Sequence, residues 1–184
     1  MPIIGNALMP FFAPGGGGDL YIVKDGVIQT GYTFAVDYIA YNSGGNTAQG
    51  STITMQSGYI QVRGAQSGST RGGSAYRMKT NIKDVISDYA YLYITCLRRV
   101  PSSTNYHNRI GTYDPTISGN YSNAKFLDYV TKTGGGNDSS AITHKIPITS
   151  ATTAKSTVNI CFAYTTYISY TTGVDIYDVW LSNS

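Results

Sequence analysis

Hydrophobic and polar residues alternate along much of the chain, and short groups of turn residues interrupt the alternation. The clearest segment is Tyr89 to Arg98, in which small or apolar residues alternate with tyrosines and a threonine. Successive side chains of a β-strand point to opposite faces, so a period of two predicts a strand. Because both sets of residues suit a buried surface, this segment is predicted to be a central strand covered on both faces.

Two pairs of neighbouring segments predict β-hairpins. Leu20 to Val23 and Val27 to Gln29 flank the dipeptide Asp25-Gly26, which favours the two-residue turns of hairpins. Ser51 to Met55 and Gly58 to Arg63 form the second pair. The other predicted strands are 32–41, 76–80, 106–113, 124–130, 141–149, 157–165 and 174–181.

Two segments depart from the strand pattern. Asn81 to Asp88 carries apolar residues at helical spacing and predicts one or two helical turns. Gly64 to Ser74 is rich in glycine, serine and threonine, and is predicted to be a long polar loop. Many short strands without intervening helices are typical of an all-β protein, and we expect an antiparallel β-sandwich with a jelly-roll-like layout.

The first 18 residues differ from the rest and predict an extended N-terminal arm before a single sandwich domain at 19–184. They lack strand alternation and end in four glycines, Gly15 to Gly18, which form a flexible joint. Phe11 and Phe12 are the candidate apolar anchors by which this arm docks on a neighbouring subunit. The alternative is a disordered terminus. Pro2 and Pro10 interrupt the segment, so no secretory signal is expected.

Composition changes the picture by pointing to weakly charged partners. The 184 residues include 17 tyrosines and 21 glycines, the ten acidic residues are all aspartates, and only 12% of residues are charged. A surface rich in tyrosine and small polar residues suits contact with a sugar or close packing against protein. The basic residues are scattered, which argues against nucleic-acid binding. No run of about 18 apolar residues occurs, so no membrane span is expected.

The residues that carry catalysis or bind metals do not converge in the sequence. His107 and His144 lie in different segments without a second ligand at a metal-like spacing. Asp175 and Asp178 are three residues apart, which in a regular strand places them on opposite faces and prevents them from acting as a glycosidase pair. We therefore expect neither an enzyme nor a cofactor. Calcium is the open alternative, with the loop from Gly135 to Ser139 as its candidate site.

The two cysteines, Cys96 and Cys161, are both placed in predicted strands. Two cysteines in a chain of this length do not form a framework of staples. We expect two reduced thiols, with a disulfide as the alternative.

The tyrosines near loops are the remaining candidates for function. An exposed tyrosine can stack on a sugar ring or anchor a subunit interface, whereas a buried one only covers a sheet face. The candidate glycan or interface contacts are Tyr106, Tyr113, Tyr121, Tyr167 and Tyr170.

Three segments within roughly the last hundred residues resemble the β-sandwich modules of bacteriophage and prophage virion proteins. These segments are 81–94, 159–162 and 176–181. The resemblance implies a homo-oligomeric structural component of a virion, such as a head fibre, capsid decoration or tail appendage, assembled in the host cytoplasm with other virion proteins and able to contact a host glycan. The alternative is a carbohydrate-binding module or lectin for a bacterial surface glycan. A glycan-cleaving enzyme is the third hypothesis.

Overall fold

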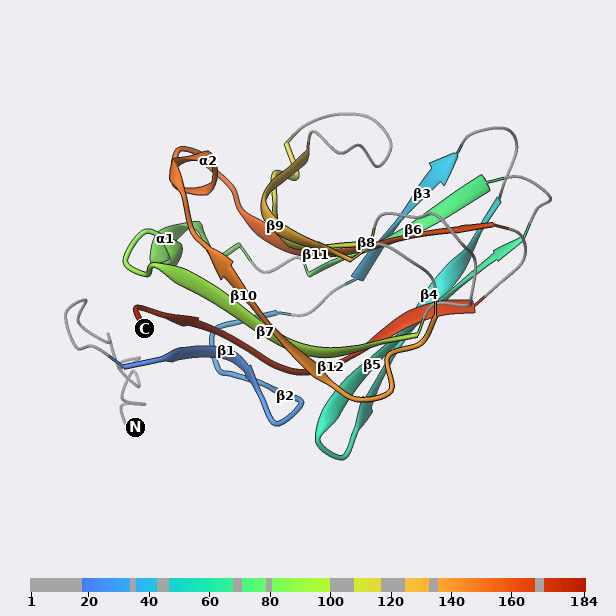
Figure 1. Ribbon diagram of the computed structural model, residues 1–184, viewed down its shortest axis with the longest axis horizontal. Helices are drawn as coiled ribbons and strands as arrows, with labels where there is room; N and C mark the ends of the chain where they lie inside the picture. The colour runs from blue at the N-terminus through green and yellow to red at the C-terminus, as the bar shows by residue number, and fades with distance from the viewer. Residues whose placement is uncertain are drawn as a thin grey trace, which may run out of the picture.

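Two antiparallel sheets pack face to face and enclose an apolar core (Figure 1). The computed structural model describes residues 18–33, 36–42, 47–67, 71–78, 81–99, 108–116, 125–132, 136–167 and 171–184. The fold is an all-β sandwich with a jelly-roll-like layout, as the alternation predicted. The predicted arm, with Phe11 and Phe12, lies outside the described residues.

Sheet A is built around its longest strand, β12. The strands of sheet A are β1 (Leu20–Lys24), β2 (Val27–Ile28), β4 (Thr47–Gln56), β5 (Tyr59–Ser67), β7 (Tyr91–Arg99), β10 (Ile142–Pro147) and β12 (Thr171–Ser182). One side of β12 pairs with β7, which in turn pairs with β10. The other side pairs first with β5 and then with β1. Among the described strands, β10 therefore forms one edge of the sheet, and β4 and β2 form the other.

Sheet B has a simpler order, β3-β6-β11-β8-β9. Its strands are β3 (Val36–Asn42), β6 (Arg71–Met78), β11 (Asn159–Tyr167), β8 (Asn108–Tyr113) and β9 (Phe126–Lys132). Two short helices, α1 (Lys83–Ile86) and α2 (Ser150–Thr153), lie at one end of the sandwich (Figure 1). Helix α1 falls within the segment predicted from helical spacing.

The first hairpin forms as Asp25-Gly26 predicted. Asp25 has φ of 50° and Gly26 has φ of 71°, the left-handed conformations that a tight hairpin turn requires. Gly26 also needs its lack of a side chain, because a Cβ there would lie 2.2 Å from the backbone nitrogen of Tyr59. The turn of the first hairpin thus packs directly against the start of β5.

The prediction of a long polar loop from Gly64 to Ser74 is wrong. Strand β5 continues to Ser67, and β6 begins at Arg71. These segments are held by backbone pairing on neighbouring strands: β5 pairs with β4 and β12, and β6 pairs with β3 and β11. Ladder hydrogen bonds do not depend on side chains, so small polar residues with weak strand propensity are accommodated.

Strand β7 alternates as predicted, but only one of its two faces is buried in the core. Leu92, Ile94 and Cys96 are fully buried between the sheets. On the other face, Tyr91 and Tyr93 are only partly buried. The prediction that β7 is covered on both faces is therefore wrong, since this outer face of sheet A carries partly exposed aromatic side chains.

Candidate functional site

Most of the tyrosines singled out from the sequence cannot be placed. Tyr106, Tyr121 and Tyr170 lie outside the described residues, and Tyr167 ends β11 with only its backbone described. Tyr113 is described in full, in β8 of sheet B.

Tyr113 is not a surface contact. It is 1% exposed, and its ring packs edge-on against Phe126 with centroids 5.5 Å apart. The sequence placed Tyr113 beside a loop, but the residue pairs with Asn159 of β11 and Phe126 of β9, so neighbouring strands lie on both sides of it. Tyr113 therefore packs against its neighbours inside the protein and is not exposed for contact with a glycan or a subunit.

Tyr129 of β9 is the exposed aromatic residue on the outer face of sheet B. Its partner in register is Gly111, and the next pair, Ile110 with Val130, points into the core. Tyr129 is 39% exposed. The guanidinium carbon of Arg109 lies 4.7 Å from the centre of its ring, and Phe126 packs against it with centroids 5.7 Å apart. Tyr129 and Arg109 thus form a cation–π pair at the surface.

The close approach of β8 to β9 depends on Gly111. A Cβ at this position would lie 2.1 Å from the carbonyl oxygen of Asp128 and 2.6 Å from the Cα of Tyr129. Any side chain here would displace Tyr129, because both of these atoms belong to the backbone. Glycine therefore fixes where the ring of Tyr129 stands.

Strand β9 is also anchored from the side of the core. The carboxylate of Asp128 accepts hydrogen bonds from the backbone nitrogen of Thr149 at 2.8 Å and from its hydroxyl at 2.6 Å. Thr149 is the N-cap of α2, and the hydroxyl of Thr152 in that helix also donates to Asp128. These bonds hold the backbone next to Tyr129, which favours a preformed site over one that orders on binding.

Two polar atoms on this face have unused hydrogen-bonding capacity. Within the described part of the chain, the buried Nε of Arg109 has no acceptor and the buried Oδ1 of Asn159 has no donor. Asn159 is 5% exposed and pairs with Tyr113, whereas Arg109 pairs with Ala163, four residues farther along β11. At the rise of a strand, the two positions are about 13 Å apart. Buried polar atoms are ordinarily satisfied, so these two indicate an incomplete set of partners.

A larger aromatic group lies on the outer face of sheet A. Trp180 of β12 stacks on Tyr93 of β7 with ring centroids 4.8 Å apart, and Tyr21 of β1 stacks on Trp180 at 5.8 Å. These three residues are cross-strand neighbours, because Trp180 pairs with both Tyr93 and Tyr21. We call them the aromatic ladder.

Lysines lie over both ends of the aromatic ladder. The ammonium of Lys24 is 4.9 Å from the centre of the Tyr21 ring. The ammonium of Lys145 lies over Tyr91 at 3.8 Å and is 5.4 Å from the centre of the Tyr93 ring. A hydrogen bond with the Tyr93 side chain raises the pKa of Lys145. The ring faces of the ladder thus contact one another and two cations. Because its three rings stack on one another across three strands, the ladder is suited to stabilising the sheet.

The aspartates predicted on opposite faces of β12 lie on the same face. Asp175 pairs with Leu97 and Asp178 pairs with Thr95. Leu97 and Thr95 are two residues apart on β7, so their side chains point to the same face of the sheet. The reason is a β-bulge between Ile176 and Asp178, which adds one residue and reverses the alternation. A strict period of two could not reveal this shift.

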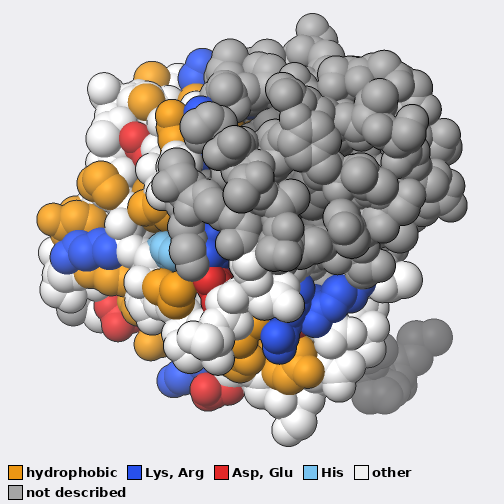
Figure 2. All heavy atoms as spheres, turned by 45° about the vertical axis from the view of Figure 1, so that its right-hand side comes forward, with side chains coloured by type: hydrophobic (Ala, Val, Ile, Leu, Met, Phe, Trp, Pro, Cys, Tyr) orange, Lys and Arg blue, Asp and Glu red, His pale blue; other side chains and the backbone are white. Residues whose placement is uncertain are grey.

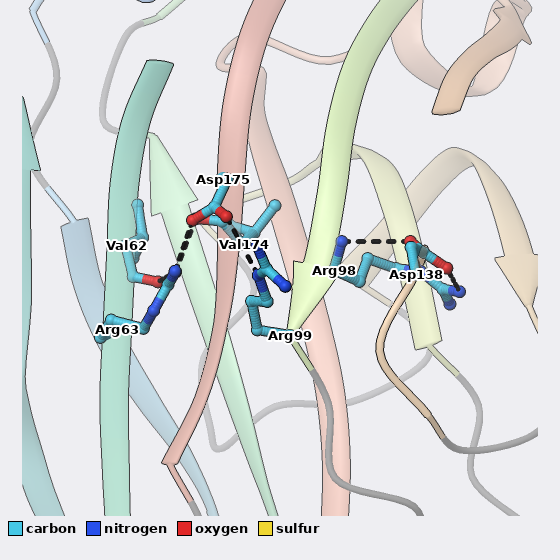
Figure 3. Close-up of polar contacts among 7 residues, drawn as sticks. All are labelled: Val62, Arg63, Arg98, Arg99, Asp138, Val174 and Asp175. Carbon is cyan, nitrogen blue, oxygen red and sulfur yellow. Dashed lines mark hydrogen bonds and ion pairs between the residues drawn. The ribbon is translucent and has the colours of Figure 1, made fainter. Parts of the chain in front are cut away.

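Asp175 is nevertheless not available for acid–base chemistry. Its side chain is 2% exposed, and its oxygens accept from Arg63 Nη2 at 2.6 Å and Arg99 Nε at 3.1 Å (Figure 3). Arg63 also donates to the carbonyl oxygens of Val62 and Val174, which fixes the guanidinium between β5 and β12. Asp178 accepts from the backbone nitrogen of Asp25 at 2.8 Å. The two carboxylates therefore serve the structure.

The candidate calcium loop holds a second buried ion pair. Asp138 receives two bonds from the guanidinium of Arg98, at 2.8 Å from Nε and 2.5 Å from Nη2 (Figure 3). The backbone nitrogen of Arg98 also donates to the same carboxylate at 3.1 Å. Asp138 thus directs its carboxylate at Arg98, and Gly135 lies outside the described residues. A calcium site in this loop stays an untested prediction.

The titratable groups of the described chain do not assemble into a metal centre. Where side chains are described, no three histidine, cysteine or aspartate residues are grouped as metal ligands would be. Cys96 and Cys161 are both buried and form no disulfide, which agrees with the expected reduced thiols. Burial raises the pKa of Cys96 to about 12, so the thiol is protonated at neutral pH.

Basic side chains are not gathered into one stripe on the described part of the face drawn in Figure 2. On the face drawn in Figure 2, the coloured Lys and Arg side chains form separate small groups among hydrophobic and uncharged ones. The part of the chain that the structure describes also contains no helix with the length and apolarity needed to span a bilayer.

No protein-family model and no curated protein sequence matches this chain. Among solved structures, it is similar to the family 11 carbohydrate-binding module of the cellulosomal cellulase Lic26A-Cel5E of Clostridium thermocellum, with 15% identity and a TM-score of 0.46 over 92% of this chain and 97% of the other. The Clostridium thermocellum family 11 module in complex with a β-1,3-1,4-mixed-linked tetrasaccharide gives 15% identity and a TM-score of 0.48 over 92% and 98%.

A third similar structure is the carbohydrate-binding module TmCBM27, which specifically recognises mannan. It shares 14% identity with a TM-score of 0.35, over 79% of this chain and 88% of the other. These structural neighbours are β-sandwich carbohydrate-binding modules. At such identities and scores the likeness is one of general fold, so the function must be argued from the residues of this chain.

Proposed function

We propose that this chain is a non-catalytic module that binds a glycan on the outer face of sheet B. The observation that carries the proposal is the surface pair of Tyr129, which is 39% exposed, and Arg109. An exposed aromatic ring offers an apolar surface to the C–H groups of a sugar, and nearby polar atoms bind its hydroxyl groups. These are the two kinds of contact that glycan binding requires.

Arg109 complements a polyhydroxylated ligand. Its guanidinium donates hydrogen bonds, and a sugar hydroxyl accepts them. The Nε of Arg109 and the Oδ1 of Asn159 are closed to solvent, and Tyr113 and Cys161, which lie between these two residues on the same face, are 1% and 0% exposed. A surface ligand therefore contacts Tyr129 and the accessible part of Arg109 and does not extend to Asn159.

Three buried aspartates support binding without cleavage, because their carboxylates are engaged within the fold. Glycoside hydrolysis uses two carboxyl groups that flank the bond to be broken. In this chain Asp175 is held by two arginines, Asp138 by Arg98, and Asp128 by Thr149 and Thr152. Each of these buried carboxylates already has its partners within the fold.

This proposal reverses the order that the sequence suggested. The resemblance to virion modules placed a structural component first and a glycan-binding module second. The exposed chemistry of sheet B favours the second reading. Membership of a virion, with its location and protein partners, stays a prediction that awaits its own test.

A glycan array of bacterial and plant polysaccharides tests the proposal with three proteins. The wild-type chain is expected to bind a defined group of glycans, and Tyr129→Ala to lose about tenfold or more in affinity because the stacking surface is removed. Tyr91→Ala is the matched control, since it removes a partly exposed tyrosine from sheet A. The proposal fails if no glycan binds, or if the two variants weaken binding equally.

Arg109 provides a second, more specific test. Arg109→Lys keeps the positive charge but removes the planar guanidinium and its Nε donor. Weaker binding in this variant, with unchanged thermal unfolding, would support recognition by hydrogen bonds. Unchanged affinity would show that Arg109 contributes only charge or packing, and would remove it from the proposed site.

A further inference from the structure

Strand β4 leaves one side of its backbone open at the edge of sheet A. Among the described strands, it pairs only with β5. Its second half, from Thr52 to Gln56, is exposed at every residue. Ile53 is 36% exposed and Met55 is 56% exposed, although both pair with fully buried residues of β5. The hairpin of β4 and β5 projects from the sandwich in Figure 1.

The opposite edge of sheet A shows how an edge is normally protected. Strand β10 carries His144, Lys145 and Pro147, and charge and proline are common devices that prevent an edge strand from pairing with another chain. Strand β4 has neither charge nor proline, since its sequence is TAQGSTITMQ. An exposed, uncharged edge with apolar residues is a template for strand pairing.

The sequence of β4 is complementary to itself in one antiparallel register. With Thr54 on a two-fold axis, Thr54 faces Thr54 of a second copy, and Ile53 faces Met55. The apolar pair then lies on one face and the threonines on the other, as cross-strand pairing favours. No like charges meet in this register, because the strand has no charged residue.

We propose that a second copy of this chain docks on β4, so that the two sheets A join into one continuous antiparallel sheet across a two-fold axis at Thr54. The contact buries Ile53 and Met55 of both copies and satisfies the free backbone groups of the edge. Because the glycan site lies on sheet B, the dimer would present two such sites.

A Thr54→Cys variant tests the register directly. Residues directly opposite in an antiparallel pair have Cα atoms about 4.5–5.5 Å apart, within the range that a disulfide spans. The variant is expected to form a covalent dimer under mild oxidation, seen on a non-reducing gel. Thr52→Cys is the control: its symmetry mate lies about 13 Å away in this register, beyond the reach of a disulfide. The native cysteines are buried and should not interfere.

Light scattering on the full chain tests the dimer itself. The wild type is expected at twice its chain mass of 19.8 kDa, and Thr54→Lys at the monomer mass, because like charges would face each other on the axis. Thr143→Lys on the edge strand β10 should remain dimeric. The proposal is overturned by a monomeric wild type, by a dimer that Thr54→Lys leaves intact, or by equal cross-linking of both cysteine variants.

Discussion

Trp180 lies flat against Tyr93 across strands β12 and β7, with ring centroids 4.8 Å apart and an interplanar angle of 8°. This contact depends on the bulge that precedes it. If β12 had the same sequence but no bulge, its side chains would alternate strictly. Trp180 would then lie on the same face as Ile176 and point into the core. The bulge therefore builds the aromatic ladder and, by the same shift, places Val179 and Leu181 in the core.

Removing the central ring of the ladder should destabilise the fold. Trp180→Ala eliminates two stacked contacts, with Tyr93 and Tyr21, each worth about 0.5–1.5 kcal/mol, so the free energy of unfolding should fall by about 1–3 kcal/mol. Trp180→Phe should lose much less. Urea denaturation followed by circular dichroism measures both, and equal stability of the alanine variant and the wild type would show that the stacks do not contribute.

The buried ion pair of Arg98 with Asp138 should be essential for stability. Both side chains are almost fully buried, so Asp138→Ala breaks a buried pair and should cost about 3–5 kcal/mol. Arg99→Gln is the control, because the side chain of Arg99 is 44% exposed and its contact with Asp175 should be worth about 1 kcal/mol or less. Thermal unfolding of both variants measures these losses of stability. Similar losses would contradict the claim that the buried pair contributes more than the exposed one.

Acid should reduce the stabilisation of the fold by the carboxylate of Asp114. Burial raises the pKa of this carboxyl, but hydrogen bonds from Thr116 and Lys155 outweigh burial and lower the pKa below its ordinary value of about 3.9. Folding thus favours the ionised form, whose stabilisation is present above about pH 4 and is lost as pH falls through the lower folded value. The stability gap between wild type and Asp114→Asn should be constant from about pH 7 to 5 and shrink below about pH 4. Urea titrations at each pH would show it, and a gap that widens in acid would contradict the assignment.

The cysteines should be unreactive until the chain unfolds. Burial raises the pKa of Cys96 to about 12, so almost no thiolate exists at pH 8, and Cys161 is equally buried. A chromogenic thiol reagent should label neither cysteine in the native protein and both in urea. Rapid labelling of Cys96 in the native protein would mean that the two sheets open far more often than this core implies.

Local signals were sufficient for much of the fold. Asp25-Gly26 predicted the first hairpin because a two-residue turn needs left-handed backbone, and the alternation of Leu92, Ile94 and Cys96 predicted the core face of β7. The strand through Gly64 to Ser67 was missed because its stability comes from pairing with distant strands. The bulge in β12 was missed because an extra residue leaves no mark in a period-two pattern.

The candidate site was less accessible from the sequence than the fold. Nearness to a loop is a poor guide to which tyrosines are exposed. Tyr113 lies near a loop and is buried, whereas Tyr129 lies in the middle of a strand and is exposed. One signal was present: Tyr129 alternates with Val130 and so belongs to the outer face. Its partners Gly111 and Arg109 come from the neighbouring strand, and only the register of β8 with β9 brings them together.

A titration of the isotope-labelled chain with the glycan selected by the array, followed by NMR, tests the central claim most directly. Glycan binding at Tyr129 predicts that amide signals of β8 and β9 shift, from Arg109 to Tyr113 and from Phe126 to Thr131. The signals of Tyr93 and Trp180 on sheet A should stay unchanged. Shifts that cluster around the aromatic ladder, with β8 and β9 unaffected, would contradict the proposed site.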